Sequence, residues 1–496
     1  MSVKKKAASK IFIGLFFRAL VSLRGLILIP IIVKTAGETV YGGYVIILSV
    51  FTIIFGISSF GIDFTTWRYL PSASIKEEKQ KLFYSLITFQ LLSVLILSLI
   101  FIIFYKWFDV YLLKKEVVFS KWIILGYLIS YVLFSQGTNY FRYTFRSNYY
   151  FIGTFLVSFG SVLLILLYFE SFGKVSINVI IDSVILMAII IVAFTFSKIV
   201  KEIGFIFYLP PFKDFVGRIR LGFPMVTWFL INTILSSSDR YIILAFMKLS
   251  DVGYYAVAYG VGSLLFIFSS VAEIIIQPIV NKEMDLHNKE SIIKIINLII
   301  KVYLIICIPF IIGTIFYAKP LIVLLANQGV AEHASKLVPY ISAGIMFYGL
   351  GMIMTIILIA ELKTKSILKA NLLAAIFNII TNIILLYFFH NIMVAAITTA
   401  LSYILSFIYI LFTLSKRWNF FSLGVSLMIK LVAISFILIE GIIYLFGFLG
   451  NLISNNLSFF VQVFIFILLY FSIIYIIGFF SKKDIEIMKQ MYIQTT

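Results

Sequence analysis

The sequence contains few of the residues from which enzymes build polar active sites. Only 12% of its 496 residues are charged, and it has one cysteine, Cys307, and three scattered histidines, His287, His333 and His390. A single cysteine excludes a disulfide within the chain, and the histidine spacing suggests no metal site. There is no glycine-rich phosphate loop ending in Lys-Ser/Thr and no Gly-x-Ser-x-Gly element. We therefore expect neither enzymatic activity nor a cofactor.

Long polar segments are also missing between the hydrophobic runs. Hydrophobic residues make up 62% of the chain, its mean hydropathy is +1.11, and no connecting segment is longer than about twenty residues. If nearly all residues of the chain lie in membrane-spanning segments, few remain to form a catalytic site outside the membrane, and this favours a transport function. The alternatives from other classes are a membrane glycosyltransferase, polymerase or ligase, which the missing large loop disfavours, and a scaffold for glycan enzymes.

The hydrophobic runs themselves have the length of membrane-spanning helices. Runs of about 20 residues match the ~30 Å hydrocarbon core at ~1.5 Å per residue, and the alternating pattern of barrel strands is not visible. We expect an all-α polytopic membrane protein with about 14 transmembrane helices, twelve being the alternative count. The expected spans are 11–33, 40–62, 82–104, 122–139, 151–169, 177–197, 222–246, 252–274, 292–317, 337–360, 367–388, 392–414, 425–448 and 457–480.

Acidic residues are about half as numerous as basic ones, 21 against 40, and the basic residues are unevenly distributed. If residues 1–10 are cytoplasmic, the cytoplasmic segments hold 26 lysines and arginines and the opposite side holds 9. This asymmetry predicts that both termini are cytoplasmic and that the protein lies in the cell inner (cytoplasmic) membrane. Basic loops beside anionic lipid explain the net charge of +19 without nucleic acid. The first apolar run lacks a cleavage site and is interpreted as a retained helix.

A basic segment around Leu209-Pro210-Pro211 interrupts the chain after the sixth expected span, and paired prolines cannot continue a helix. The parts on either side show weak internal similarity, since a Gly-Tyr element precedes a long span and a proline in both, with Gly42 and Pro71 corresponding to Gly253 and Pro278. Such similarity is typical of duplicated transporters. The expected domains are an N-terminal six-helix lobe at 1–208, a second six-helix lobe at 209–415, and two additional helices with a cytoplasmic tail at 416–496.

Two stretches resemble a known family. Residues 23–71, with LRGLILIP, YGGY and WRYLP, and residues 221–258, with LGFPMVTW, SSSDRY and DVGYYAVA, are similar to the two repeats of polysaccharide flippases in the multidrug/oligosaccharidyl-lipid/polysaccharide exporter superfamily. The resemblance implies two pseudo-symmetric six-helix lobes plus two C-terminal helices. It also implies export of undecaprenyl-pyrophosphate-linked repeat units of O-antigen, lipopolysaccharide or capsule, among membrane lipids, with a polysaccharide polymerase and chain-length machinery as partners. Chain length and repeat closure favour a monomer.

Two other substrates within the superfamily remain as alternatives. The basic triad associated with lipid II flippases is not found at clear positions, and spans two and eight contain no arginine, so a peptidoglycan-precursor flippase is the runner-up. A cation-coupled multidrug antiporter would need an acidic binding cavity, whereas cations outnumber acids in the expected spans.

Four cations within the spans are the candidate substrate-binding residues of a cationic lumen: Arg18, Arg24, Arg240 and Lys301. Each costs roughly 2.5–3.5 kcal/mol at mid-bilayer, so they should face a wet cavity or a counter-charge. Arginine suits a pyrophosphate because its planar guanidinium stays charged and binds two oxygens at once. The alternatives are that Arg18 snorkels to the cytoplasmic interface and that Arg240 forms an ion pair with the adjacent Asp239.

The other acids within spans are Asp182, Glu273 and Glu440, which we interpret as buried candidates for a coupling-ion site. The alternative interpretation is structural, because Glu273 lies near a helix end and Glu440 lies outside the repeat. The glycines Gly42 and Gly253 are expected to cap a loop or to let two helices approach closely.

Overall fold

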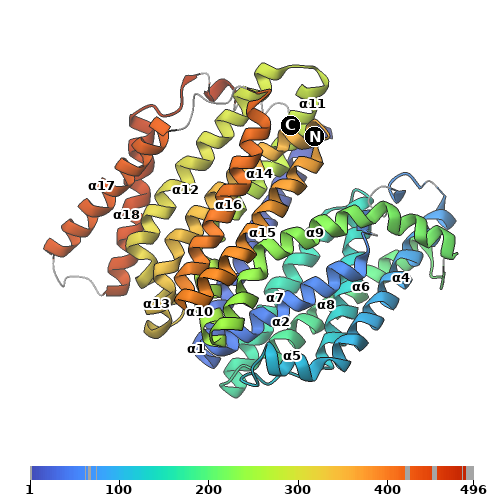
Figure 1. The fold of residues 1–496 in the computed structure, drawn as a ribbon. Coiled ribbons are helices and arrows are strands. Elements are labelled where there is room, and N and C mark those ends of the chain that lie inside the picture. Colours follow the sequence, from blue (N-terminus) through green and yellow to red (C-terminus); the bar gives the residue numbers. More distant parts are fainter. Residues whose placement is uncertain are drawn as a thin grey trace. The chain divides into compact units, whose positions relative to one another are not determined.

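The computed structural model describes residues 3–61, 63–64, 69–73, 75–209, 211–418, 425–449, 455–482 and 484–487. Within these residues all regular structure is helical and no strand occurs (Figure 1). Helices satisfy every backbone hydrogen bond within one segment, which an apolar chain in lipid requires. The helices form two compact units, the first unit at Ser9–Ala256 and the second unit at Val257–Thr496 together with Met1–Ala8.

The first unit is built around α6, which packs against α4, α7 and α8, while α2 contacts α4, α6 and α9. Its core contains Phe83 of α4, Tyr140 and Phe141 of α6, and Ile199 of α8, all at most 1% exposed. Its helices are α1 (Val3–Ala36), whose residues up to Ala8 belong to the second unit, α2 (Glu38–Ser59), α4 (Lys76–Ile103), α5 (Tyr105–Tyr111), α6 (Ile123–Tyr143), α7 (Asn148–Phe172), α8 (Ile177–Ile203) and α9 (Phe212–Phe246).

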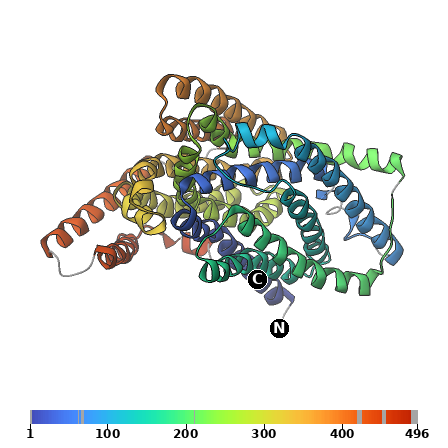
Figure 2. The ribbon, with the colours of Figure 1, turned by 90° about the horizontal axis from the view of Figure 1, so that it is seen from below.

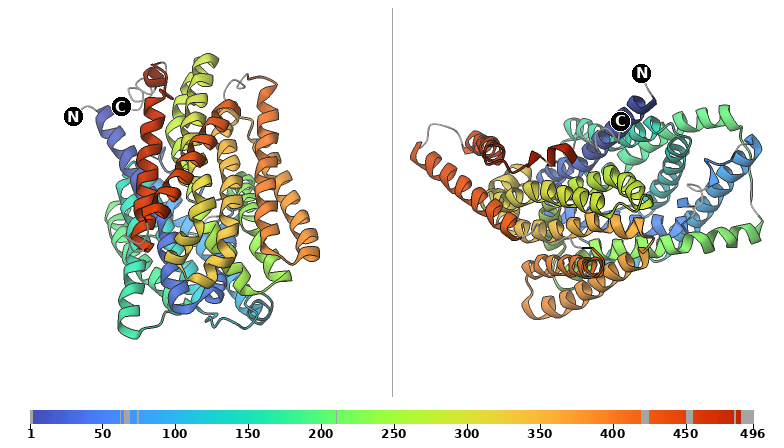
Figure 3. Two further views of the ribbon diagram at one scale, coloured as in Figure 1. Left: turned by 90° about the vertical axis from the view of Figure 1, so that its left-hand side faces the viewer. Right: turned by 90° about the horizontal axis from the view of Figure 1, so that it is seen from above.

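The second unit is built around α14, which contacts α11, α12, α15 and α16. Helices α15 and α16 lie side by side (Figures 1 and 2). The last two helices stand beside α12, since α17 contacts α12 and α18 contacts α17 (Figure 3). Its helices are α11 (Leu265–Asp285), α12 (Lys289–Leu325), α13 (Gln328–Ala334), the 3₁₀ helix η1 (Ser335–Leu337), α14 (Val338–Ala360), α15 (Thr364–Phe389), α16 (Ile392–Ser415), α17 (Val425–Leu449) and α18 (Asn455–Ile476); α10 (Leu249–Gly262) crosses the boundary between the units.

Among the described residues, thirteen helices are long and apolar enough to cross a membrane, which confirms a polytopic all-α fold. The fourteenth expected span corresponds to α6, whose 21 residues are long enough but include buried polar side chains such as Ser130, Gln136 and Thr138. The expected spans 252–274 and 292–317 are wrong in their bounds. The first is broken between Gly262 and Leu265, and the second extends to 37 residues because its charged ends continue the helix.

The break between α10 and α11 follows a stretch of weak helix formers. Gly260, Gly262 and Ser263 have lower helix propensity than the apolar residues around them. The Ser263 hydroxyl donates to the Gly260 carbonyl at 2.9 Å, which is one of the local bonds that compete with a regular helix.

Contacts within each unit join segments that the charge pattern places on one side of the membrane. In the first unit Arg146 forms an ion pair with Glu202 at 2.7 Å, joining two segments expected in the cytoplasm. In the second unit Arg417 pairs with Glu361 at 2.5 Å, again between two such segments. Each unit is therefore internally consistent with the predicted topology, while the side that faces the cytoplasm stays a prediction.

Gly42 and Gly253 occupy equivalent places in the internal repeat, and each of them contacts the helix that carries the other. A Cβ added to Gly42 of α2 would lie 2.3 Å from the carbonyl oxygen of Leu249 in α10, and one added to Gly253 would lie 2.2 Å from that of Glu38. Leu249 lies four residues before Gly253, and Glu38 lies four residues before Gly42, so the two contacts are equivalent. Reciprocal contacts of this kind are made by equivalent residues beside a two-fold axis. The expected close helix approach is confirmed.

The compact units do not coincide with the expected lobes. Helix α9 joins the first unit because it lies along α2, where a Cβ on Gly61 would lie 2.1 Å from the Gly222 carbonyl oxygen and Phe229 approaches Gly56 just as closely. The lobes at 1–208 and 209–415, which rest on the repeat, stay a prediction.

Candidate functional site

Arg24 of α1 lies among tyrosines of two other helices in the first unit. Its guanidinium is within electrostatic range of the hydroxyls of Tyr44 on α2 and of Tyr127 and Tyr131 on α6. Two of its nitrogens, Nε and Nη2, are buried and meet no hydrogen-bond partner in the described part of the chain. Buried donors without acceptors are costly. We call Arg24, Tyr44, Tyr127 and Tyr131 the arginine–tyrosine site.

The tyrosines of this site are held in place by aromatic packing. Tyr127 and Tyr131 are four residues apart on one face of α6, and their rings stack with centroids 5.6 Å apart at an interplanar angle of 6°. Phe51 and Phe55 of α2 pack against Tyr127 at 5.0 Å and against Tyr131 at 4.9 Å. A tyrosine fixed in this way presents an apolar ring and a hydroxyl that can donate or accept.

Arg240 of α9 lies next to the same part of α2. It is within electrostatic range of Tyr41 and Tyr241, and its Nη1 donates to the Ser237 hydroxyl at 3.3 Å. The Tyr41 and Tyr44 rings are 6.4 Å apart, so this tyrosine pair connects the surroundings of Arg240 with those of Arg24. The structure thus brings these two predicted site residues into one neighbourhood.

Asp239 has a partner that the sequence did not suggest. The Tyr255 hydroxyl on α10 donates to Asp239 Oδ2 at 2.7 Å, and both residues are 1% exposed. This bond fixes α10 to α9 beside Arg240. The predicted ion pair of Asp239 with Arg240 stays a prediction.

A second acid of the first unit was missed by the sequence analysis. Asp63, four residues after the end of α2, accepts a hydrogen bond from Gln136 Nε2 at 2.6 Å, and the same nitrogen lies 2.8 Å from Gln90 Oε1. Both glutamines are at most 1% exposed. The sequence signal for this residue is an acid immediately after the apolar run at 40–62.

Lys301 of α12 is paired, and it lies in the second unit. Its Nζ is 2.8 Å from Asp484 Oδ2, with both side chains less than one-fifth exposed, and it lies over the Phe480 ring at 5.6 Å. Helix α12 has 37 residues and is about 55 Å long at ~1.5 Å per residue, which is longer than a ~30 Å hydrocarbon core. Lys301 lies in the first half of this helix and has its own counter-charge.

The remaining predicted residues lie apart from the arginine–tyrosine site or outside the description. The side chain of Arg18 is not among those that the structure describes. Asp182 and Glu440 are exposed on their helices and Glu273 is half-buried, so a coupling-ion site at these acids stays a prediction. The side chains of Asp182 and Glu440 are carried on the outer faces of α8 and α17. No cluster of three or more metal-ligating side chains occurs among the described residues.

Comparison with known proteins agrees with this architecture. The family model described as polysaccharide biosynthesis protein matches residues 8–277, more than half of the chain, and the model described as MatE matches residues 224–384. No curated protein matches the chain.

Solved structures share the fold at low sequence identity. The lipid II flippase MurJ in an inward closed conformation is 20% identical, with a TM-score of 0.70 over 94% of this chain and 98% of that one. An inward-facing multidrug resistance MATE family transporter is 12% identical, with a TM-score of 0.66 over 80% and 94%. The MATE multidrug transporter DinF-BH is 16% identical, with a TM-score of 0.58 over 85% and 98%.

These structural neighbours are described as a lipid II flippase and as multidrug transporters. The family match shows that this chain belongs to the polysaccharide biosynthesis protein family, within the multidrug/oligosaccharidyl-lipid/polysaccharide exporter superfamily, and the thirteen apolar helices of its described residues show a multi-pass membrane protein.

Proposed function

We propose that this protein moves undecaprenyl-pyrophosphate-linked oligosaccharide repeat units, of the kind used for O-antigen or capsule, from the inner to the outer leaflet of the cytoplasmic membrane. The observation that carries the proposal is the arginine–tyrosine site. Arg24 keeps two buried donor nitrogens without acceptors, and a pyrophosphate would supply the missing acceptor oxygens. Such charge-assisted hydrogen bonds are about twice as strong as neutral ones.

The surrounding tyrosines suit the other part of such a substrate. Tyr44, Tyr127 and Tyr131 offer hydroxyls beside the guanidinium together with aromatic ring faces, and a sugar presents both hydroxyls and apolar ring hydrogens. The cationic Arg24 and Arg240 would repel a cationic drug. The site therefore supports an anionic substrate over the cationic substrates expected for a multidrug antiporter.

A lipid II-type precursor is the second candidate, because its pyrophosphate would satisfy the same arginines and the fold resembles that of a lipid II flippase. Complementation separates the two. The protein should restore surface glycan in cells that lack their repeat-unit flippase, and the lipid-linked repeat unit should stop accumulating. Restored growth of cells depleted of their lipid II flippase, without restored surface glycan, would assign the precursor of peptidoglycan instead.

The proposed orientation, with both termini cytoplasmic, has its own test. Cys307 is fully buried, so in a Cys307→Ser background a single new cysteine can report its side of the membrane. Lys174→Cys should react with a membrane-impermeant thiol reagent in intact cells, and Lys201→Cys should react only after permeabilisation. The reversed pattern would invert the topology, and labelling of both would show an error in the span count.

A further inference from the structure

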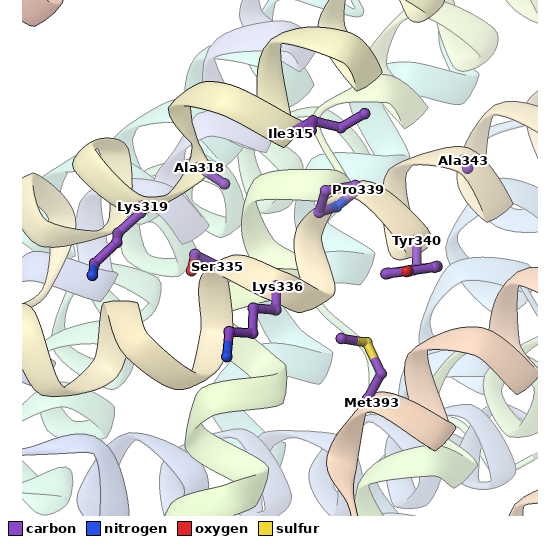
Figure 4. Close-up of a pocket in the computed structure, with 9 residues that line it drawn as sticks. All are labelled: Ile315, Ala318, Lys319, Ser335, Lys336, Pro339, Tyr340, Ala343 and Met393. Carbon is purple, nitrogen blue, oxygen red and sulfur yellow. The ribbon is translucent and has the colours of Figure 1, made fainter.

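The second unit contains a pocket that the proposed transport path does not use (Figure 4). Its volume is about 590 Å³, and four elements contribute to it. The lining residues are Ile315, Ala318 and Lys319 of α12, Ser335 and Lys336 of η1, Pro339, Tyr340 and Ala343 of α14, and Met393 of α16.

One side of this pocket is cationic. Lys319, Ser335 and Lys336 lie together on it, apart from Tyr340 and Met393 (Figure 4). Both lysines are exposed, and neither forms an ion pair within the described residues. Two ammonium groups and a hydroxyl offer donors for an anion, and lysine is a common phosphate ligand.

The other side of the pocket is apolar and opens toward the surroundings of the protein. Ile315 is 55% exposed and Tyr340 is 46% exposed, and Met393 and Ala343 complete this side. The pocket lies toward the end of α12 and the beginnings of α14 and α16, so in a bilayer it falls near one membrane–water interface. Tyrosine is enriched at that depth, where lipid headgroups meet acyl chains.

We propose that this pocket binds the phosphate of a membrane lipid, with the two lysines holding the phosphate and the apolar side holding the start of the lipid chain. Neither a free sugar nor a cationic compound matches both sides. The proposal does not depend on the transported substrate, because the lipid can be a glycerophospholipid of that leaflet or a polyprenyl phosphate.

Native mass spectrometry of the purified full-length protein tests the proposal, with phosphatidylglycerol, undecaprenyl phosphate and zwitterionic phosphatidylethanolamine as probes. In the Lys319→Gln, Lys336→Gln variant we expect the tightest-bound phosphatidylglycerol or undecaprenyl phosphate to be lost, with Kd raised roughly tenfold or more, in line with two charge-assisted contacts. Whichever of these two lipids shows the larger change identifies the source of the phosphate, and phosphatidylethanolamine binding should change less.

The matched control is Lys106→Gln, Lys174→Gln, which removes two exposed lysines predicted to lie on the same side of the membrane but outside the pocket. Lys319→Arg, Lys336→Arg keeps the charge and should keep the bound lipid, which separates a charge effect from misfolding. Equal losses in the glutamine variant and the control, or no loss in either, would overturn the proposal.

Discussion

The crossing of α2 and α10 at Gly42 and Gly253 should not tolerate a single added methyl group. A Cβ at these positions would lie 2.3 Å from the Leu249 oxygen and 2.2 Å from the Glu38 oxygen, whereas real Cβ contacts essentially never fall below 3.0 Å. The helices must therefore separate by about 0.7 Å for Gly42→Ala and about 0.8 Å for Gly253→Ala. The obstructing atoms are backbone oxygens, so no side chain can rotate away.

The cost of this separation can be estimated against a matched control. Overpacking a tight contact costs about 1–3 kcal/mol, while alanine in place of glycine inside a helix gains about 1 kcal/mol. Gly313 of α12 and Gly441 of α17 have no atom within 4 Å of an added Cβ, so Gly313→Ala and Gly441→Ala should be neutral or stabilising. Relative to these controls, Gly42→Ala should lower the free energy of unfolding by about 1–3 kcal/mol.

Thermal unfolding in detergent, followed by tryptophan fluorescence, measures this difference. The double variant Gly42→Ala, Gly253→Ala should lose less stability than the sum of the single variants, because one separation of the helices relieves both contacts. A Tm for Gly42→Ala equal to that of Gly313→Ala would refute the close crossing. Strict additivity of the two losses would show that the contacts are independent, which contradicts a shared crossing.

Two further predictions concern buried and half-buried carboxylates. Asp484→Asn should cost about 1–2 kcal/mol because it removes the charged partner of Lys301. Partial burial raises the pKa of Asp484, but hydrogen bonds from Lys301 and Ser481 outweigh it and hold that pKa below its usual value. The stabilisation should be present at neutral pH and disappear as pH falls below about 4, which thermal unfolding across pH in both proteins would show; an unchanged gap at low pH would contradict it. Tyr255→Phe should lower stability by about 1–3 kcal/mol because it takes a donor from the buried Asp239, and an unchanged Tm would show that the bond is not needed.

The fold was largely predictable from the sequence because a segment that crosses lipid must pair its backbone groups within a long apolar helix. Apolar length alone identified most of the helices, and the equivalence of Gly42 and Gly253 was visible in the two Gly-Tyr elements. The break between α10 and α11 was not visible, because it involves no proline and no charge. Helix α6 is not among the thirteen most apolar helices because it carries polar residues, and three of these, Ser130, Gln136 and Thr138, are buried in the structure.

The candidate site was predictable only in its charged residues. Arg24 and Arg240 stand out because an arginine is rare in an apolar run. The tyrosines around Arg24 do not stand out, since the chain has 29 tyrosines and nothing in their spacing selects Tyr44 or Tyr127. The partner of Lys301 could not be predicted either, because Asp484 is 183 residues away and only the tertiary fold brings it near.

The most direct test of the transport mechanism is the export of lipid-linked glycan by variants of Arg24 and Arg240, measured as surface glycan in cells lacking their own repeat-unit flippase. Arg24→Ala with Arg240→Ala should abolish export at an unchanged level of membrane-inserted protein, because the pyrophosphate loses its cationic partners. Lysine at both positions should restore part of the export, since the charge survives but the two-oxygen geometry of arginine does not. Full export by the double alanine variant would contradict the arginine–tyrosine site as the place where the pyrophosphate is neutralised.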